Sequence, residues 1–409
     1  MSDAQLRSVL LGLFAIGLAV SITLAELALV ALALRLGFRM LTGRVRLETW
    51  PLVWPFAAWI AATILSALAS GHQIESLTAA KGLLLIVTFY AVLDALPDVT
   101  AAERFVAMLL ALIGAVGVIG ILQVAFCPDL AAWAPSLGRV ASHCHRAHAF
   151  YSIYMTMAGV LSLVLLVALP GVLAMPARSR ERRTAAIAWL IGGAALALTY
   201  VRGAWVGFVT GVAVLVALLR RGRAVVIAAV LLLGLGIVLA PGLRQRAESI
   251  ADPSDPTARD RWAMWRSGIA MAVERPLVGF GPGGVKREYP NYVRPEALHR
   301  TRGHLHNTPL QILVERGVLG LVAWLAIFVT FFARAAAILK VLEPDERRER
   351  ALVTGSIAAI AGFLVGGLTE YNFGDSEVVM VAYVVMTLPF VTERVRSRPR
   401  VQYDSCTPA

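Results

Sequence analysis

Two histidines, two arginines and an Asn-Thr-Pro turn stand together in the stretch TRGHLHNTPLQILVERG. A neutral histidine accepts a proton near pH 7, so it can act as a general base when a hydroxyl must become a nucleophile. Pro309 suits the first turn of a helix, and Asn307 or Thr308 can cap that turn. His306, just before an apolar run, is therefore a candidate catalytic base, with His304 and Asn307 in support. The alternative is an interfacial histidine hydrogen-bonded to backbone or to a lipid head group.

Arginine supplies nearly all of the positive charge. Only Lys81, Lys286 and Lys340 are lysines among the 38 basic residues, and the net charge is +12. Guanidinium groups bind phosphate through paired, planar hydrogen bonds, whereas an ammonium acts as a point charge. A GC-rich genome with basic cytoplasmic loops would give the same excess, so the positions of the arginines decide between the two interpretations.

The elements that carry these groups are those of a membrane protein. The chain is 58% hydrophobic and 16% charged, with a mean hydropathy of +0.72. A soluble domain carries about 25% charged residues. Many apolar runs approach the roughly 20 residues that a helix needs to cross a bilayer. We therefore predict an all-α polytopic membrane protein with about twelve transmembrane helices and one long, helical periplasmic loop.

Twelve spans account for the basic loops. A turn within GLAVSITLAE divides the first apolar run, and the predicted spans cover residues 8–21, 23–36, 52–70, 77–96, 104–126, 148–173, 184–200, 204–219, 224–241, 307–339, 351–369 and 377–393. The loops FRMLTGRVR, RSRERR, RRGR and EPDERRER and the tail ERVRSRPR then share one side with both termini. The positive-inside rule makes that side cytoplasmic.

The chain then divides into four parts. About nine spans occupy 1–241, a periplasmic loop occupies 242–306, about three spans occupy 307–393, and a cytoplasmic tail occupies 394–409. The periplasmic loop is rich in arginine where a short loop would not be, although long loops are translocated largely regardless of charge. An anion bound at the outer face is the preferred explanation.

The candidate ligands of that anion lie in or beside the outer loops. Arg202 begins the span that starts RGAWVG, and Lys81 lies one turn inside the outer end of its span. Ionisable groups at this depth usually face a cavity, although snorkelling to the interface is the alternative. The full set is Arg202, Arg261, Arg266, Lys81, Arg259 and Arg146.

The stretch DPTARDRWAMWRSGIAMAVERP within the outer loop predicts a helix. Its apolar stripe comprises Trp262, Met264, Trp265, Ile269 and Ala272. Tryptophans suit the head-group layer, so the helix is a candidate interfacial helix; a solvated amphipathic helix is the alternative. LVGFGPGG, which follows, is interpreted as a tight turn because it lacks the strand that a nucleotide fingerprint requires.

Several acidic residues and two cysteines are also predicted to lie on the outer side. Glu370 and Asp375 in TEYNFGDSE reach it and are candidates to support the site. The acids within 252–260 are neutralised by neighbouring arginines, so no metal is expected. Cys127 and Cys144 also fall on this side, where a disulfide is possible, although nothing in the sequence fixes their distance.

Three motifs carry a resemblance to a known family. RGAWVG, then RWAMW followed by PLVGFGPGG, then HLHNTPLQILVERGVLG resemble, in order and separation, the O-antigen ligase and polymerase superfamily of bacterial envelope enzymes. The resemblance spans most of the chain. It implies an inner-membrane C-type glycosyltransferase that takes a glycan from undecaprenyl diphosphate at the periplasmic face, without a cofactor. The compact chain and single long loop look most like the ligase, whose acceptor is lipid A-core in lipopolysaccharide biosynthesis. An O-antigen polymerase or a protein O-oligosaccharyltransferase is the alternative.

The residues and the resemblance lead to one mechanism. Guanidinium groups bind the departing diphosphate in place of a metal, and His306 takes a proton from the acceptor hydroxyl. Direct displacement inverts the anomeric configuration. A lipid-linked glycan transporter or flippase is the rival from another class, and it would place charges at the bilayer midplane and show repeats. The expected partners are the donor, the acceptor and membrane lipids, with no nucleic acid.

Overall fold

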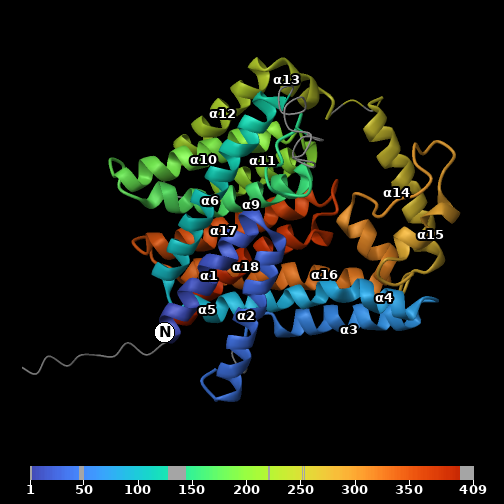
Figure 1. The fold of residues 1–409 in the computed structure, drawn as a ribbon, viewed down its shortest axis with the longest axis horizontal. Coiled ribbons are helices and arrows are strands. Elements are labelled where there is room, and N and C mark those ends of the chain that lie inside the picture. The colour runs from blue at the N-terminus through green and yellow to red at the C-terminus, as the bar shows by residue number, and fades with distance from the viewer. Residues whose placement is uncertain are drawn as a thin grey trace, which may run out of the picture.

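The structure is a computed structural model, which describes residues 2–45, 50–127, 144–219, 222–250, 252 and 254–396. Helices make up most of these ranges, and no strand occurs among the residues described. In Figure 1 many of the apolar helices lie side by side, and α14 and α15 gather at one end of them. The predicted tail lies outside the described residues from 397 onward.

Each of the twelve predicted spans coincides with helical structure. The helices in question are α1 (Asp3–Val20), α2 (Ile22–Leu41), α3 (Val53–Ala69), α4 with η2 and α5 (Gln73–Ala79, Ala80–Ile86, Val87–Ala95), α6 (Val99–Ala125), α9 (Tyr154–Ala174), α10 (Arg180–Leu198), α11 (Arg202–Leu218), α12 (Arg223–Leu239), α16 (Thr308–Val341), α17 (Arg347–Gly366) and α18 (Ser376–Arg396). The remaining elements are α13 (Pro241–Glu248), α14 (Pro256–Glu274), α15 (Gly284–Tyr292) and η4 (Asn372–Gly374).

Seven helices in the described part are long and apolar enough to cross a membrane. They are Asp3–Val20, Gln73–Ala95, Val99–Ala125, Tyr154–Ala174, Thr308–Val341, Arg347–Gly366 and Ser376–Arg396. The pair α12 and α13, bent by 102°, makes an eighth if it is one span. The apolar helices α3 and α11 are shorter, and α2 and α10 carry three and four charged residues. A helical structure with seven candidate membrane spans is thus confirmed for the described residues, while the count of twelve stays a prediction.

A tight turn joins α1 to α2 at the position that the sequence predicted. Ser21 caps α2, because its hydroxyl accepts a hydrogen bond from the Leu24 N–H at 3.5 Å. A Cβ on Gly17 would lie 2.3 Å from the Ala25 nitrogen, so only glycine allows this close approach of the two helices. The single apolar run therefore becomes a helical hairpin.

Arginines bind the helix ends together at the end of the bundle far from α14. Arg35 donates to Asp3 at 2.7 Å and to Asp94 at 2.6 Å, joining α1, α2 and α5. Arg348 at the start of α17 pairs with Glu103 at the start of α6. We call this the arginine-rich end. Arg396, near the end of α18, pairs with Glu346 at this end as well.

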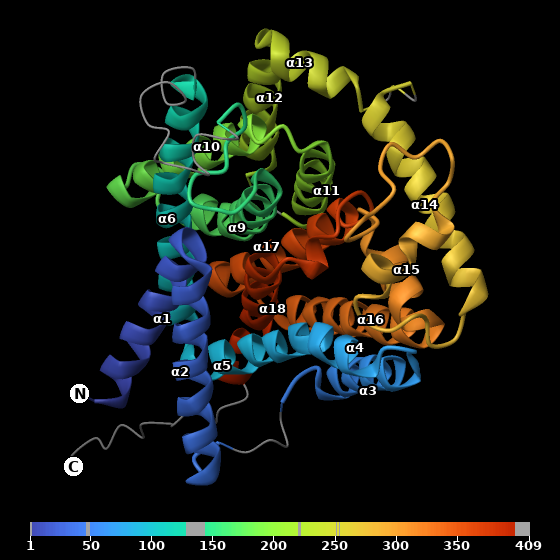
Figure 2. The same ribbon diagram turned by 45° about the vertical axis from the view of Figure 1, so that its right-hand side comes forward.

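The glycine-rich turn after α14 fills a break in α16. Gly317 has φ +64°, which interrupts the helix. The Val318 N–H donates to the Pro276 carbonyl at 2.7 Å, and the Phe280 N–H donates to the Val314 carbonyl at 3.0 Å. The turn therefore satisfies backbone groups that the break leaves open, as an apolar surrounding requires. The turn also fixes α14 against α16. In Figure 2, α16 lies side by side with α3.

The close contact between the glycine-rich turn and the break in α16 predicts that a methyl group added there lowers the stability of the fold. A Cβ on Gly279, whose φ is +68°, would lie 2.5 Å from the Glu315 carbonyl carbon, whereas a Cβ on Gly234 in α12 would meet nothing within 4 Å. Gly279→Ala is therefore expected to destabilise the fold by about 1–3 kcal/mol through strain. Gly234→Ala serves as the matched control and should leave the melting temperature in detergent unchanged or slightly higher. Equal melting temperatures for the two variants would contradict the packing of this turn.

Candidate active site

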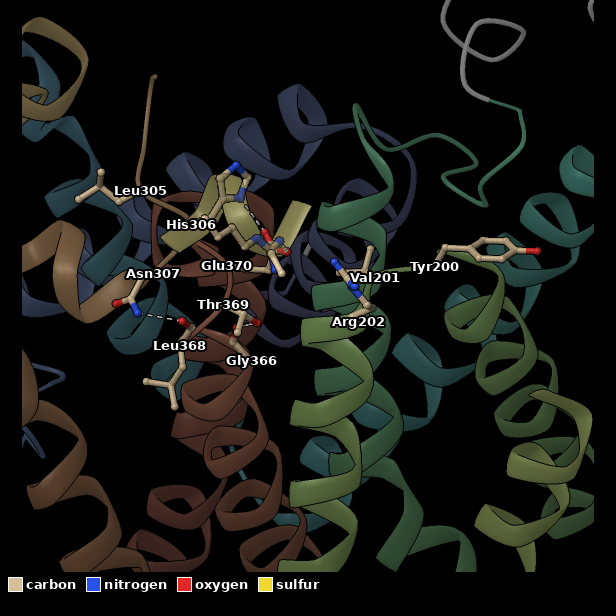
Figure 3. Close-up of polar contacts among 12 residues, drawn as sticks. Tyr200, Val201, Arg202, Leu305, His306, Asn307, Gly366, Leu368, Thr369 and Glu370 are labelled. Atoms are coloured by element: carbon tan, nitrogen blue, oxygen red, sulfur yellow. Dashed lines mark hydrogen bonds and ion pairs between the residues drawn. The ribbon is translucent and has the colours of Figure 1, made fainter. Parts of the chain in front are cut away.

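The site forms where three segments meet at the end opposite the arginine-rich end. The segment 303–307 precedes α16, the segment 367–375 joins α17 to α18, and α14 approaches both. Thr308 donates its backbone N–H to the Gly367 carbonyl at 2.7 Å and its hydroxyl to the Glu370 carbonyl at 2.9 Å. Asn307 caps α16 by accepting from the Leu310 N–H at 2.9 Å, and its amide donates to the Leu368 carbonyl at 2.9 Å. These bonds fix the two segments to each other (Figure 3).

His306, Glu370 and Arg261 form one connected group. His306 Nδ1 lies 3.0 Å from Glu370 Oε2, and Arg261 Nη2 donates to Glu370 Oε1 at 2.5 Å. The three side chains are between 12% and 16% exposed, so water screens their charges only in part. Figure 3 shows His306 and Glu370 facing each other. The sequence named all three residues; the structure pairs them.

The carboxylate sets the orientation of the histidine. Burial opposes the charge on Glu370, but the hydrogen bond from His306 and the charge of Arg261 outweigh it, so the pKa of Glu370 lies below its ordinary value. A carboxylate at Nδ1 places the proton of a neutral imidazole there, which leaves Nε2 as the basic atom. His306 also has φ +47°, a backbone strained for a residue with a side chain. Its ring is thus directed by the surrounding bonds.

His304 lies beside His306 in a drier environment. The two ring centroids are 4.2 Å apart, and the Tyr371 ring is 5.8 Å from His304. Burial, with the nearby charge of His306, lowers the pKa of His304 to about 4. His304 is therefore neutral at pH 7. Its buried Nδ1 has no hydrogen-bond partner among the described residues.

A cavity of about 230 Å³ extends from His304 between α9, α11, α17 and α18. Its polar lining includes His304, Glu370, Tyr371 and Asp375, and its remaining walls are largely apolar. Asp375 accepts a hydrogen bond from the Thr156 hydroxyl at 2.5 Å and caps α18. The cavity is therefore suited to a molecule with a polar end and an apolar body.

Arg202 is positioned at the start of α11 and already has protein partners. It donates to the Ser249 carbonyl at 2.6 Å, to the Ser249 hydroxyl at 2.9 Å and to Asp255 at 3.1 Å. Asp255 is the N-cap of α14 and accepts from the Ala258 N–H at 3.1 Å. Arg202 thus fixes the start of the helix that carries Arg261.

Further cations surround Arg202. Arg246, at the end of α13, donates to the Tyr200 carbonyl at 3.4 Å and is close enough to Arg202, Arg146 and Arg261 to be repelled by them. Arg146 stacks over the Tyr154 ring at 4.4 Å. We call Arg146, Arg202, Arg246 and Arg261 the arginine group. Asp255 and Glu370 are the carboxylates bound to it, so the group keeps an excess of positive charge.

The structure does not bring the other predicted cations to this group. Arg259 and Arg266 are exposed on another face of α14, where Arg266 pairs with Glu296 at 3.4 Å. Lys81 lines a separate cavity of about 800 Å³ between α2, η2, α16 and α18. That cavity shares Tyr371 and Gly374 with the cavity beneath His304, so the two are neighbours.

Cys127 and Cys144 form a disulfide, with their Cα atoms 5.1 Å apart. The sequence left this pairing open. Within the described ranges, no group of three or more His, Cys, Asp or Glu side chains could hold a metal ion. The expectation of metal-independent chemistry stays a prediction.

Sequence reasoning missed several residues of the site. Arg246 belongs to the arginine-rich outer loop without a motif that marks it, and Tyr371 and Thr308 are not among the site residues that the sequence predicts. Tyr371 directly follows Glu370, and Thr308 follows Asn307, so proximity in sequence was the available signal. The binding of Arg202 to Ser249 and Asp255 had no such signal, because it joins residues 47 and 53 positions apart.

The lowered pKa of Glu370 predicts a pH-dependent contribution to stability. The ionised carboxylate stabilises the folded state above the ordinary glutamate pKa of 4.5, and this contribution is lost as the pH falls through the lower, folded value. Wild type should therefore melt at a higher temperature than Glu370→Gln at pH 7, and the difference should shrink below about pH 4.5. Glu248→Gln, at a side chain 66% exposed, is the control and should show little difference. A gap between wild type and Glu370→Gln that stays constant to pH 3 would contradict the charged network.

One comparison with known proteins identifies part of the chain. Residues 185–325 match the model of a family described as O-antigen ligase. The match runs from α10 into α16 and includes Arg202, Arg261 and His306, while Glu370 lies beyond it. No curated protein matches the chain. The matched family comprises glycosyltransferase-like membrane enzymes, ligases and polymerases. Residues 185–325, about a third of the chain, are therefore similar to the O-antigen ligase family.

Proposed function

We propose that the protein is an O-antigen ligase: an inverting, metal-independent glycosyltransferase that moves a glycan from undecaprenyl diphosphate to lipid A-core. The observation that carries this proposal is the group of His306, Glu370 and Arg261 beside the arginine group. It brings a candidate base next to candidate ligands of a diphosphate. A glycosyl transfer to a hydroxyl from such a donor needs both.

His306 acts as the general base. Its Nε2 accepts the proton of the acceptor hydroxyl as the oxygen attacks the anomeric carbon, while Glu370 at Nδ1 stabilises the imidazolium that forms. The bond between the anomeric carbon and the diphosphate oxygen breaks on the opposite side, so the configuration inverts. His304, neutral at pH 7, packs against His306 and keeps a second positive charge away from the base.

The arginine group binds the donor diphosphate. Four guanidinium groups can stabilise the negative charge that builds on the leaving group, which is the part a metal ion plays in other enzymes. The sequence assigned Arg259, Arg266 and Lys81 to the same role; their positions outside the group favour Arg146, Arg202, Arg246 and Arg261 instead. The largely apolar cavity beneath His304 is suited to the lipid that bears the diphosphate.

The orientation proposed is the one expected from the sequence, with the site facing the periplasm of a bacterial inner membrane and both termini in the cytoplasm. The arginine-rich end then faces the cytoplasm, in agreement with the positive-inside rule. The disulfide between Cys127 and Cys144 supports an oxidising outer side. A polymerase or a protein O-oligosaccharyltransferase would use the same base and leaving group with a different acceptor.

The flippase alternative makes different demands. It requires a charged path near the bilayer midplane and movement of one half of the protein against the other. The buried pair of Glu315 and Arg316 at the break of α16 meets part of that description, since their side chains are only 5% and 9% exposed. However, this pair is tied to α3 through Arg316 and Thr63 at 3.3 Å. These bonds favour a fixed structural role.

Replacement of the base tests the proposal directly. His306→Ala, reconstituted in proteoliposomes with a lipid-diphosphate glycan and lipid A-core, should form the joined product about 10²–10⁴-fold more slowly. His72→Ala, at an exposed histidine, is the matched control and should retain the wild-type rate. Near-normal transfer by a His306→Ala protein with a normal melting temperature would show that His306 is not the base.

Two variants separate phosphate binding by Arg202 from its anchoring of α14. Arg202→Lys should lower the rate about tenfold or more, because an ammonium cannot reproduce a planar fork. Asp255→Asn keeps a good helix cap but breaks the ion pair, so it frees the guanidinium for the donor and should leave transfer near the wild-type rate. If Asp255→Asn loses as much activity as Arg202→Lys, Arg202 serves only as an anchor. Arg244→Lys, 61% exposed, is the control.

A further inference from the structure

The face of α14 that points away from the arginine group forms a cavity of its own. Arg259, Trp262, Ala263 and Arg266 follow one another at intervals of three, one and three residues, which places them on one side of the helix. With Glu296 they line an open cavity of about 470 Å³. This helix lies at the edge of the molecule in Figures 1 and 2. We call this hollow the α14 cavity.

The larger side chains that line the α14 cavity are exposed, whereas Ala263 at its base is buried. Trp262 is 57% exposed, although an indole is among the costlier groups to leave in water. Arg259 is exposed without an ion pair in the described part of the chain, and Arg266 is 67% exposed in its pair with Glu296. Exposed tryptophan and arginine together are typical of surfaces that bind a ligand.

The wall opposite α14 is held in place by a buried carboxylate. Asp260 accepts hydrogen bonds from the Leu298 N–H at 2.9 Å and from Arg302. The Ser267 hydroxyl accepts from the Arg294 N–H at 3.3 Å. These three hydrogen bonds fix to α14 the segment that carries Glu296. The cavity is therefore a built feature of the fold.

The α14 cavity is linked through two tryptophans to the segment that holds the candidate base. The rings of Trp262 and Trp265 are 5.2 Å apart, and the Trp265 indole donates to the Leu305 carbonyl at 3.1 Å. Leu305 directly precedes His306. On the other side, Arg261 precedes Trp262 and binds Glu370. A molecule that contacts Trp262 is thus connected through Trp265 to Leu305, the residue before His306.

We propose that the α14 cavity binds anionic sugars of the acceptor glycan, an inference that rests on the proposed function. The apolar face of a sugar ring stacks on the Trp262 indole, Arg259 and Arg266 bind a phosphate or carboxylate on the glycan, and Glu296 accepts hydrogen bonds from its hydroxyls. The two cations outnumber the single acid, which matches an anionic ligand. The donor diphosphate stays with the arginine group on the other face of α14.

Equilibrium binding tests the site without the need for transfer. The full chain in phosphatidylcholine nanodiscs is titrated with fluorescent lipid A-core, either intact or treated with phosphatase. Trp262→Ala and the double variant Arg259→Gln/Arg266→Gln should each weaken binding of the intact acceptor about tenfold. Phosphatase treatment should abolish the effect of the double variant if the arginines bind phosphate. If they bind carboxylates, the effect should persist until those groups are amidated.

Two exposed apolar residues on the same helix provide the matched control. Ile269 and Val273 are 54% and 74% exposed and lie outside the α14 cavity. Ile269→Ser and Val273→Ser should leave acceptor binding unchanged. An equal loss in these variants and in Trp262→Ala would show that this face contacts the bilayer, and would overturn the proposal.

Transfer kinetics separate this site from the proposed function. In the reconstituted reaction the α14 cavity variants should raise the acceptor KM about tenfold while kcat and the donor KM stay near wild type. Unchanged binding and unchanged acceptor KM in these variants would overturn the site while the ligase function stands. A wild-type chain that binds lipid A-core in this cavity yet transfers no glycan would contradict the function and support the site.

Discussion

The candidate site depends on one buried carboxylate that is shared between two cationic or protonated partners. Glu370 accepts from Arg261 on α14 and lies against His306 before α16, while its own backbone receives the Thr308 hydroxyl. Removing a charge from such a network leaves its partners buried and unpaired, which costs more than the pair itself contributes. This one charge therefore connects the orientation of His306 to α14 and to the segment after α17.

The backbone hydrogen bonds between the glycine-rich turn and α16 also hold α14 in the position from which Arg261 reaches Glu370. A helix broken inside an apolar bundle would leave N–H and C=O groups without partners, and the turn at 276–281 supplies them. The same turn follows α14 directly, so the backbone bonds that repair α16 also determine where α14 lies. The arginine that binds Glu370 and the face that forms the α14 cavity are both set by this contact.

Much of the fold could be predicted from apolar runs, because crossing a bilayer imposes a length and a composition that are visible in the sequence. The turn near Ser21 and the cap at Asn307 were also predictable, since their residue types act locally. The sequence could not show which face of a helix packs against which neighbour. On α14 the arginines at 259, 261 and 266 have the same chemistry, and only packing shows that Arg261 alone reaches Glu370. LVGFGPGG was interpreted as a turn, but its pairing with a break thirty-odd residues later could not be inferred from composition.

The wide spacing of the site residues along the chain has a consequence for its biogenesis. Glu370 lies 64 residues after His306 and 109 residues after Arg261. Contacts between such distant positions form late, because the loops between them must close first. As the chain is synthesised, the helix with Arg261 and the segment with His306 are both complete before their carboxylate emerges. Orientation of the base therefore waits for the docking of the last helices, so the site stays unassembled until nearly the whole bundle is in the membrane.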